Sequence, residues 1–289
     1  MKPVNKQQQL HVPFLCLITV FAGSLQSTAL AETVFPDTKA LFHGFTMFHD
    51  TVSGERVVVP AVTAAGKPWV WRARFWGHQP QFDLAMLKRG YHLAFCDISN
   101  LFGNEEAIDI GNRFYKKLVN HHDFSPQPVL EGMSRGGLFV YNWALANPDK
   151  VTAIYADAPV MDFKSWPGGI RAGKQGPGSS AWQTCLKAYS LSQDEALIYS
   201  KGPLNLLHVL AKENIPLIHV IGEEDTVVPP SENTNIAQTR YTKLGGTIRV
   251  IRKQGVGHHP HSLDDPTPLV NFIERAWEAS QTKPLHPIP

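Results

Sequence analysis

The stretch Gly132-Met133-Ser134-Arg135-Gly136 decides the fold predicted for this chain. An apolar run, residues 128–130, precedes it, and a run of helix-forming residues, 137–146, follows it. This order predicts a strand, a sharp turn at Ser134 and a helix. Glycines two positions before and two after the serine let the turn close and let the helix pack on the strand, because bulkier side chains would clash there. The start of the helix would then point free N–H groups and a partial positive charge at Ser134.

Strand, G-x-S-x-G and helix together resemble the nucleophile elbow of the α/β-hydrolase superfamily. The resemblance implies that Ser134 is a catalytic nucleophile and that its partners follow along the chain in the order acid, then histidine. A serine hydroxyl is unreactive at its own pKa, so this role requires a neighbouring base. The alternative is a serine that only caps a helix within a glycine-rich turn.

The candidate acid is Asp225, which follows a strand predicted to end at Gly222. Residues 222–229 resemble the superfamily's G-x-x-D-x-x-V-P loop. A carboxylate there would hold the imidazole tautomer and stabilise the imidazolium ion. The alternatives are a capping role for Asp225 and four competing carboxylates, those of Glu223, Glu224, Asp157 and Asp162.

The candidate base is His258, in the segment Gly255-Val256-Gly257-His258-His259-Pro260-His261. Two glycines allow this loop to bring an imidazole back over the edge of the sheet. His259 and His261 compete for the role, but the superfamily often shows Gly-x-Gly-His-x-Pro-His here with the first histidine catalytic. The three histidines also suggest a metal site, which we disfavour because no Asp, Glu or Cys set with ligand spacing accompanies them.

An oxyanion hole needs two backbone donors. The resemblance implies that one is the N–H of Arg135, the residue after the nucleophile. The other is expected from the loop after the third strand, residues 74–78, where Phe75 and Trp76 are the candidates. The His-Gly-Gly-Gly motif of lipases is absent from this sequence.

Aromatic and basic residues are predicted to line the substrate pocket. The candidates for substrate binding are Arg74, Trp71, Trp166 and His259. A positive rim that fits an anionic substrate would come from Arg72, Arg74, Arg135, Lys164 and Arg171. Core packing is the alternative for the tryptophans, and a solvated surface or structural ion pairs for the basic residues.

Alternation of strand and helix patterns predicts an α/β fold, specifically the α/β-hydrolase fold with a mostly parallel central sheet, helices on both faces and an antiparallel N-terminal edge. Besides the strand before Ser134, strands are predicted over residues 45–52, 55–60, 69–75, 91–98, 151–156, 215–222 and 247–252. Helices are predicted over residues 79–89, 105–121, 137–146, 234–244 and 267–279. One catalytic domain over residues 32–289 would carry a cap-like insertion at about 162–210, where Gly, Pro and Ser break the alternation.

The first 31 residues read as a signal peptide. Lys2 and Lys6 precede an apolar run, residues 12–23, and Ala29-Leu30-Ala31 is a small-x-small cleavage site. The expected protein is therefore secreted or periplasmic; an uncleaved anchor is the alternative. Export would permit a disulfide between Cys96 and Cys185, with buried free thiols equally compatible with the sequence.

Composition excludes several classes of function. The chain has 289 residues, 43% of them hydrophobic, and a formal net charge of +2. A chain of this length and hydrophobic share can form one large core. The charge is too small to indicate a nucleic-acid partner, and no basic stripe with interleaved aromatics occurs. We expect neither a cofactor nor a metal, and no stable membrane insertion; the oligomeric state stays open.

Three blocks, residues 69–78, 130–137 and 255–262, resemble exported bacterial hydrolases of prolyl-oligopeptidase-like or carbohydrate esterase type, including pectin methylesterase-like enzymes. The resemblance implies a secreted serine esterase that removes acetyl or methyl ester substituents from a small-molecule or polysaccharide substrate. A peptidase or lipid esterase of the same fold is one alternative. A non-catalytic sugar-binding protein that kept the fold is another.

Overall fold

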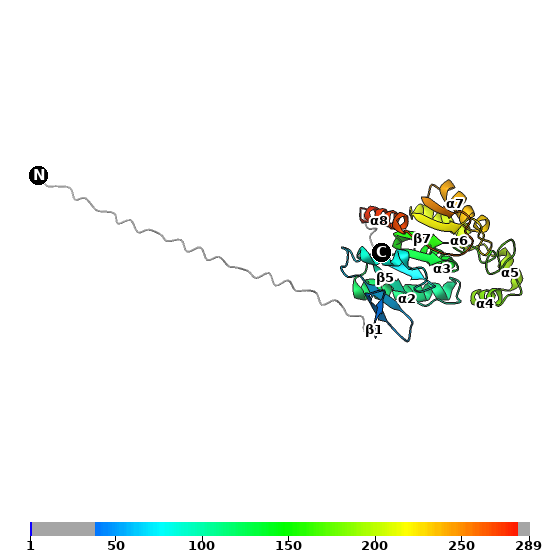
Figure 1. The fold of residues 1–289 in the computed structure, drawn as a ribbon, viewed down its shortest axis with the longest axis horizontal. Helices are drawn as coiled ribbons and strands as arrows, with labels where there is room; N and C mark the ends of the chain where they lie inside the picture. The colour runs from blue at the N-terminus through cyan, green and yellow to red at the C-terminus, as the bar shows by residue number, and fades with distance from the viewer. Residues whose placement is uncertain (2–37, 283–289) are drawn as a thin grey trace. The chain divides into compact units, whose positions relative to one another are not determined.

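Nine strands within residues 38–282 form one mixed sheet, in the order β1-β2-β3-β5-β4-β6-β7-β8-β9 (Figure 1). The computed structural model describes Met1 and these residues, so the expected signal peptide, apart from Met1, lies outside the described part, as do residues 32–37 and 283–289. Three strands at one edge are antiparallel: Thr38–Phe42 (β1), Phe45–His49 (β2) and Arg56–Val59 (β3). The six parallel strands are Trp69–Ala73 (β4), His92–Phe95 (β5), Val129–Met133 (β6), Ala153–Asp157 (β7), Leu217–Gly222 (β8) and Ile248–Lys253 (β9).

The predicted fold class is confirmed, and most strands are shorter than predicted. The sequence analysis missed β1, because this edge strand is largely exposed and lacks the apolar alternation that marks a half-buried strand.

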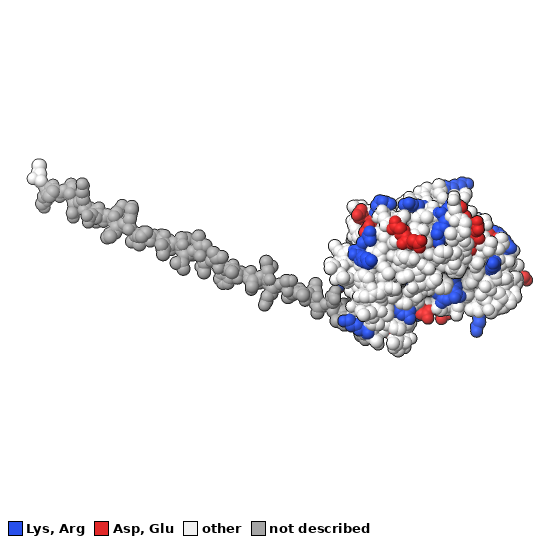
Figure 2. Space-filling model, in the orientation of Figure 1, with Lys and Arg blue, Asp and Glu red and all other residues white. Residues whose placement is uncertain are grey.

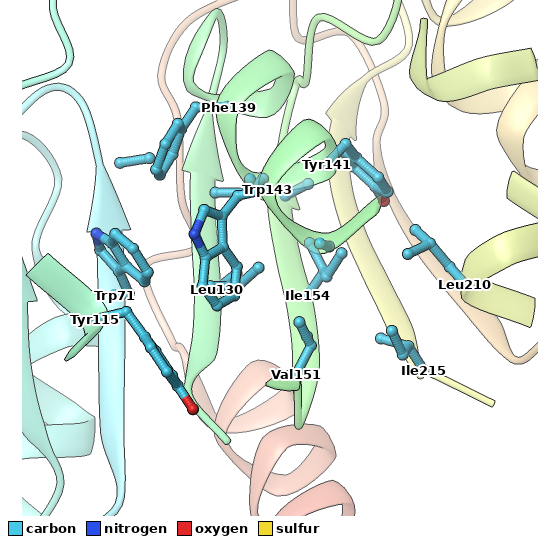
Figure 3. Close-up of a cluster of buried hydrophobic side chains, with 14 of the residues drawn as sticks. Trp71, Tyr115, Leu130, Phe139, Tyr141, Trp143, Val151, Ile154, Leu210 and Ile215 are labelled. Atoms are coloured by element: carbon cyan, nitrogen blue, oxygen red, sulfur yellow. The ribbon is translucent and has the colours of Figure 1, made fainter. Parts of the chain in front are cut away.

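Helices cover both faces of the sheet, as predicted. One face is covered by Gln81–Lys88 (α1) and Thr267–Gln281 (α8). The other is covered by Glu105–His122 (α2), Gly136–Ala146 (α3), Pro203–Lys212 (α6) and Thr234–Lys243 (α7). Figure 3 shows the core on this second face, where Trp71, Phe139 and Trp143 meet from β4 and α3.

The segment predicted as a cap contains a loop and the helices Ser180–Tyr189 (α4) and Gln193–Ile198 (α5), which Figure 1 shows at the periphery of the fold. Trp182 of α4 and Ala196 of α5 are buried in a third apolar cluster with Phe163 and Val228. The last helix of the predicted insertion, α6, instead packs its leucines into the main core. It therefore belongs to the helical layers of the sheet.

Charged side chains are dispersed on the face drawn in Figure 2, where the described residues place basic and acidic groups in scattered clusters without one continuous basic band. Among the described residues, no helix has the length and apolar character needed to cross a bilayer.

Arg72 on β4 is a buried cation, only 1% exposed. Its guanidinium pairs with Asp83 on α1 and with Glu131 on β6, 3.1 Å away. The same group donates hydrogen bonds to the carbonyl oxygens of Phe75, at 3.1 Å, and of His78. Arg72 therefore ties the loop after β4 to the interior of the sheet.

This loop needs such support, because Arg74 and Phe75 have φ values of +68° and +46°. Residues other than glycine adopt this left-handed conformation at a cost, and they keep it only where surrounding contacts impose it. Arg72 supplies such contacts through its hydrogen bonds to the carbonyl oxygens of Phe75 and His78.

Burial and the neighbouring Asp83 carboxylate raise the pKa of Glu131 well above its ordinary value. We expect Glu131 to keep its proton at neutral pH, so that Arg72 faces one anion, Asp83. A Glu131→Gln variant should then lose less than about 1.5 kcal/mol of unfolding free energy, because it replaces one neutral hydrogen-bonding group by another. Asp83→Asn should lose about 3–5 kcal/mol, because it leaves a buried cation without a counter-charge. Urea denaturation at pH 7 measures both; equal losses would show that Glu131 is ionised.

His219 on β8 is a fully buried histidine, with its ring nitrogens 2.5 Å from the Tyr141 hydroxyl and 3.0 Å from Thr234 Oγ1. Burial lowers the pKa of His219 to about 3. In the unfolded chain a histidine titrates near pH 6.5. Between these two values the unfolded state binds one more proton, so the stability that neutral His219 contributes is lost as the pH falls.

We therefore predict that the unfolding free energy decreases on acidification below about pH 6.5, by up to about 1.4 kcal/mol per pH unit from this one group. Urea denaturation from pH 7.5 to pH 5.0 measures the slope. A His219→Gln variant should show a slope reduced by about one proton; an unchanged slope would contradict the assignment.

Candidate functional site

The candidate site lies at the edge of the sheet where the parallel strands end. Ser134 follows β6, Asp225 follows β8 and His258 follows β9. Parallel strands bring their carboxyl ends to one edge, so residues far apart along the chain meet there.

Ser134 sits on a strained turn, as the elbow pattern predicts. Its φ of +50° is left-handed, an unfavourable region for a residue with a side chain. The Ser134 N–H donates to the carbonyl of Asp157 at 2.8 Å, and its own carbonyl accepts from Gly137 and Val160, each at 2.9 Å. These three backbone hydrogen bonds hold the turn from β7, from the segment after β7 and from the first turn of α3.

Two glycines let the turn close. A Cβ atom at Gly132 would lie 2.6 Å from Cγ2 of Val140, and one at Gly136 would lie 2.5 Å from the carbonyl oxygen of Ala73. Both distances are shorter than van der Waals contact. Glycine at these positions lets helix α3 pack against β6 and β4.

The structure brings the three predicted side chains into one hydrogen-bonded series. Ser134 Oγ lies 3.0 Å from Nε2 of His258, and Nδ1 of His258 lies 2.7 Å from Oδ2 of Asp225. The other carboxylate oxygen of Asp225 accepts the N–H groups of Val227 and Val228, both at 2.8 Å. Asp225 is therefore fixed from both sides, and the competing Glu223 and Glu224 are exposed.

This geometry is suited to proton transfer. A carboxylate on Nδ1 favours the tautomer that carries the proton there, which leaves the lone pair of Nε2 directed at the serine hydroxyl. The hydroxyl donates to that lone pair, so its proton can pass to His258 as Oγ attacks an electrophile.

A second histidine–aspartate pair holds the histidine loop. Nδ1 of His261 lies 2.6 Å from Oδ1 of Asp157, while Oδ2 of Asp157 accepts the Ser262 N–H at 2.8 Å and the Tyr155 hydroxyl at 3.1 Å. Asp157, weighed as a rival acid, thus lies with His261, and both are buried. The pair anchors the loop that carries His258 to the end of β7.

His259 is exposed and lies at the rim of the site, with its ring centroid 5.0 Å from that of His258. Partial burial, followed by the neighbouring His261 and His258, lowers the pKa of His259, so it stays neutral at neutral pH. The nearest nitrogens of His258, His259 and His261 lie within 4.8 Å of one another. Because Ser134 and Asp225 occupy both nitrogens of His258, a metal ion bound to this ring would have to displace one of them.

The loop after β4 lies against the elbow, where a Cβ atom at Gly136 would lie 3.6 Å from Cβ of Arg74. Within residues 38–282, the backbone N–H groups of Arg135, Phe75 and Trp76 donate no hydrogen bond. The Trp76 ring points away, packing on Phe42 and Phe95.

Trp166 and Arg74, which the sequence analysis expects to bind substrate, both lie close to Arg135 of the elbow. The Arg135 guanidinium carbon lies 5.9 Å from the Trp166 ring centroid and 5.6 Å from that of Phe75. Arg74 and Arg135 line one small hollow with Phe102.

Two predicted site residues are elsewhere. Trp71 is 0% exposed and stacks in the core against Trp143 and Phe139, so its assignment to substrate binding is wrong (Figure 3). Arg72, expected on a positive rim, is buried in the ion pairs described above. Alternation along a strand places these neighbours on opposite faces of the sheet, but β4 is central and both of its faces are covered.

Sequence reasoning missed two buried polar groups, Arg72 with Glu131 and His261 with Asp157. A signal for the first exists: Arg72 and Glu131 are charged residues in otherwise apolar strands, and they are register partners on β4 and β6. Cys96 and Cys185, whose pairing the sequence left open, are both buried free thiols.

Comparisons by sequence found no matching protein-family model and no matching curated protein. Comparison by structure found α/β-hydrolase folds. A putative dipeptidyl aminopeptidase IV from Bacteroides ovatus has a TM-score of 0.57 at 14% identity, over 82% of this chain and 35% of that one. A puromycin hydrolase has a TM-score of 0.57 at 13% identity, over 88% of this chain and 40% of that one.

The acylaminoacyl peptidase of Pyrococcus horikoshii has a TM-score of 0.56 at 14% identity, over 87% of this chain and 42% of that one. The chain thus spans between 35% and 42% of the length of these proteins. At such identities the likeness concerns the fold. From its sheet order, its two helical layers and these neighbours, the chain has the α/β-hydrolase fold.

Proposed function

We propose that the protein is a serine hydrolase that cleaves acyl compounds through a covalent intermediate on Ser134. One observation carries the proposal: Ser134 Oγ, His258 and Asp225 form a continuous hydrogen-bonded series, with 3.0 Å and 2.7 Å between successive members. A helix-capping serine would need neither an imidazole nor a carboxylate behind it.

In the proposed reaction, His258 takes the Ser134 proton while Oγ bonds to the acyl carbon. The bond from that carbon to the leaving nitrogen or oxygen then breaks, and His258 gives the leaving group the proton. Water attacks the acyl-serine next, with His258 as base, and the proton finally returns to Ser134. Asp225 stays ionised throughout and stabilises the imidazolium.

Negative charge develops on the acyl oxygen during both attacks. The free N–H of Arg135 at the start of α3 would donate to this oxygen, as would the N–H of Phe75 or Trp76 from the adjoining loop. Arg72, paired with Asp83, donates hydrogen bonds to the carbonyls of Phe75 and His78 and so keeps this loop in its strained conformation. The donors would therefore be in place before the reaction.

The class of bond is a separate part of the proposal. The structural neighbours are named as peptidases and a puromycin hydrolase. They favour an amide or peptide bond over the carbohydrate ester that the sequence resemblance implies, for which the structure offers no specific support. We therefore propose a peptidase or acyl-amide hydrolase; esters of simple acids serve as reactive probes of the same relay.

Replacing Ser134 by Ala should lower kcat for 4-nitrophenyl acetate by about 10⁴-fold or more, because the nucleophile is lost. Circular dichroism should show a folded protein. Retained turnover in the folded variant would refute the role of Ser134.

Asp225→Asn should lower kcat by about 10³- to 10⁴-fold, because the amide favours the wrong imidazole tautomer. Asp162→Asn is the matched control, since Asp162 caps a turn by accepting the Lys164 N–H. If the control lost activity while Asp225→Asn kept it, the acid would be misassigned.

A panel of substrates should separate the bond classes. We expect Ser134-dependent release of 4-nitroaniline from N-acylated aminoacyl and dipeptidyl 4-nitroanilides. Release of acetate from acetylated xylan or of methanol from methylated pectin, without anilide cleavage, would instead favour the carbohydrate esterase.

A further inference from the structure

Arg135 carries a half-buried guanidinium beside the proposed nucleophile. Its Cζ lies 5.6 Å from the ring centroid of Phe75 and 5.9 Å from that of Trp166, within range of a cation–π contact with each. Among residues 38–282 this guanidinium has no ion pair and donates no hydrogen bond. Two aromatic rings thus hold the group while its N–H donors stay unused.

A second arginine adds to the positive charge. Arg74 lies with its Cζ 5.3 Å from the same Phe75 ring and lines the same hollow as Arg135. Arg74 donates to Ser99 Oγ, which in turn donates to Asp97, so its charge is partly balanced. Its buried Nε has no hydrogen-bond partner among the described residues.

A partly desolvated cation without a counter-charge is unfavourable in a protein that has no ligand bound beside it. Burial and the nearby Arg74 lower the pKa of Arg135, which shows that the surroundings oppose its charge. Planar guanidinium donors match the two oxygens of a carboxylate, and both the hydrogen bonds and the charge would then be satisfied.

We infer that the side chain of Arg135, with Arg74 beside it, is a subsite for a carboxylate of the substrate. The inference rests on the proposed function and narrows it: the substrate is an acidic acyl compound, such as a peptide with Glu or Asp at the scissile bond. Because Arg135 directly follows Ser134, the carboxylate lies within one side chain's reach of the reacting carbonyl. The backbone N–H of Arg135 keeps its separate role toward the oxyanion.

The test compares N-acetyl-glutamate 4-nitroanilide with its neutral isostere, N-acetyl-glutamine 4-nitroanilide, on the full chain. The ratio of their kcat/KM values is the readout; if neither is cleaved, the ratio of their inhibition constants against 4-nitrophenyl acetate replaces it. Calorimetric titration of the Ser134→Ala protein gives the corresponding ratio of dissociation constants without turnover. Hydrolysis of 4-nitrophenyl acetate reports on the proposed function independently.

We expect the acidic compound to be preferred by about ten- to a hundredfold, because a hydrogen-bonded charge pair forms only with it. The preference should fall toward unity in Arg135→Gln and shrink with added salt. Arg249→Gln, which removes an exposed arginine near the other end of β9, should keep the preference.

Equal recognition of both compounds by the wild-type protein would overturn the inference, as would a preference that survives in Arg135→Gln. An equal loss for both compounds in Arg135→Gln would also overturn it, since the guanidinium would then serve the oxyanion or the packing of the loop. Absent hydrolysis of 4-nitrophenyl acetate would refute the proposed function alone, because calorimetry still measures the preference.

Discussion

The left-handed backbone of Ser134 is the constraint on which the rest of the site depends. A serine at φ +50° is unfavourable by itself, and it persists because three backbone hydrogen bonds and the close packing of α3 impose it. The turn lifts Oγ above the end of β6, at the edge where β8 and β9 also end. Without it, the imidazole of His258 would have no hydroxyl to accept from.

Two buried polar groups stabilise the loops around this turn. His261 and Asp157 fix the loop of His258 to β7, and Arg72 with Asp83 and Glu131 fixes the loop of Phe75 to β4 and β6. Buried ion pairs contribute little net stability, but they impose geometry because each partner penalises displacement of the other. In this protein they hold both the loop of His258, the proposed base, and the candidate oxyanion donors, which would reduce reorganisation during a reaction.

Much of the fold was predictable from the sequence, because the elbow pattern combines a steric rule with an order of elements. The same order located Ser134, Asp225 and His258, which the structure brings together. What failed depended on tertiary context. Trp71 and Arg72 are both buried because β4 is a central strand. Alternation along one strand does not show whether that strand is central or at an edge. The partner of His261 lies 104 residues away, so only the folded sheet reveals it. The edge strand β1 lacked an apolar pattern altogether.

Phosphonylation tests most directly whether His258 activates Ser134 as a nucleophile. A fluorophosphonate reacts with an activated serine and hardly at all with an ordinary hydroxyl. We predict one adduct per chain, located on Ser134 by peptide mass spectrometry and formed far more slowly in His258→Gln. No adduct, an adduct on another residue, or the same rate in His258→Gln would contradict the account.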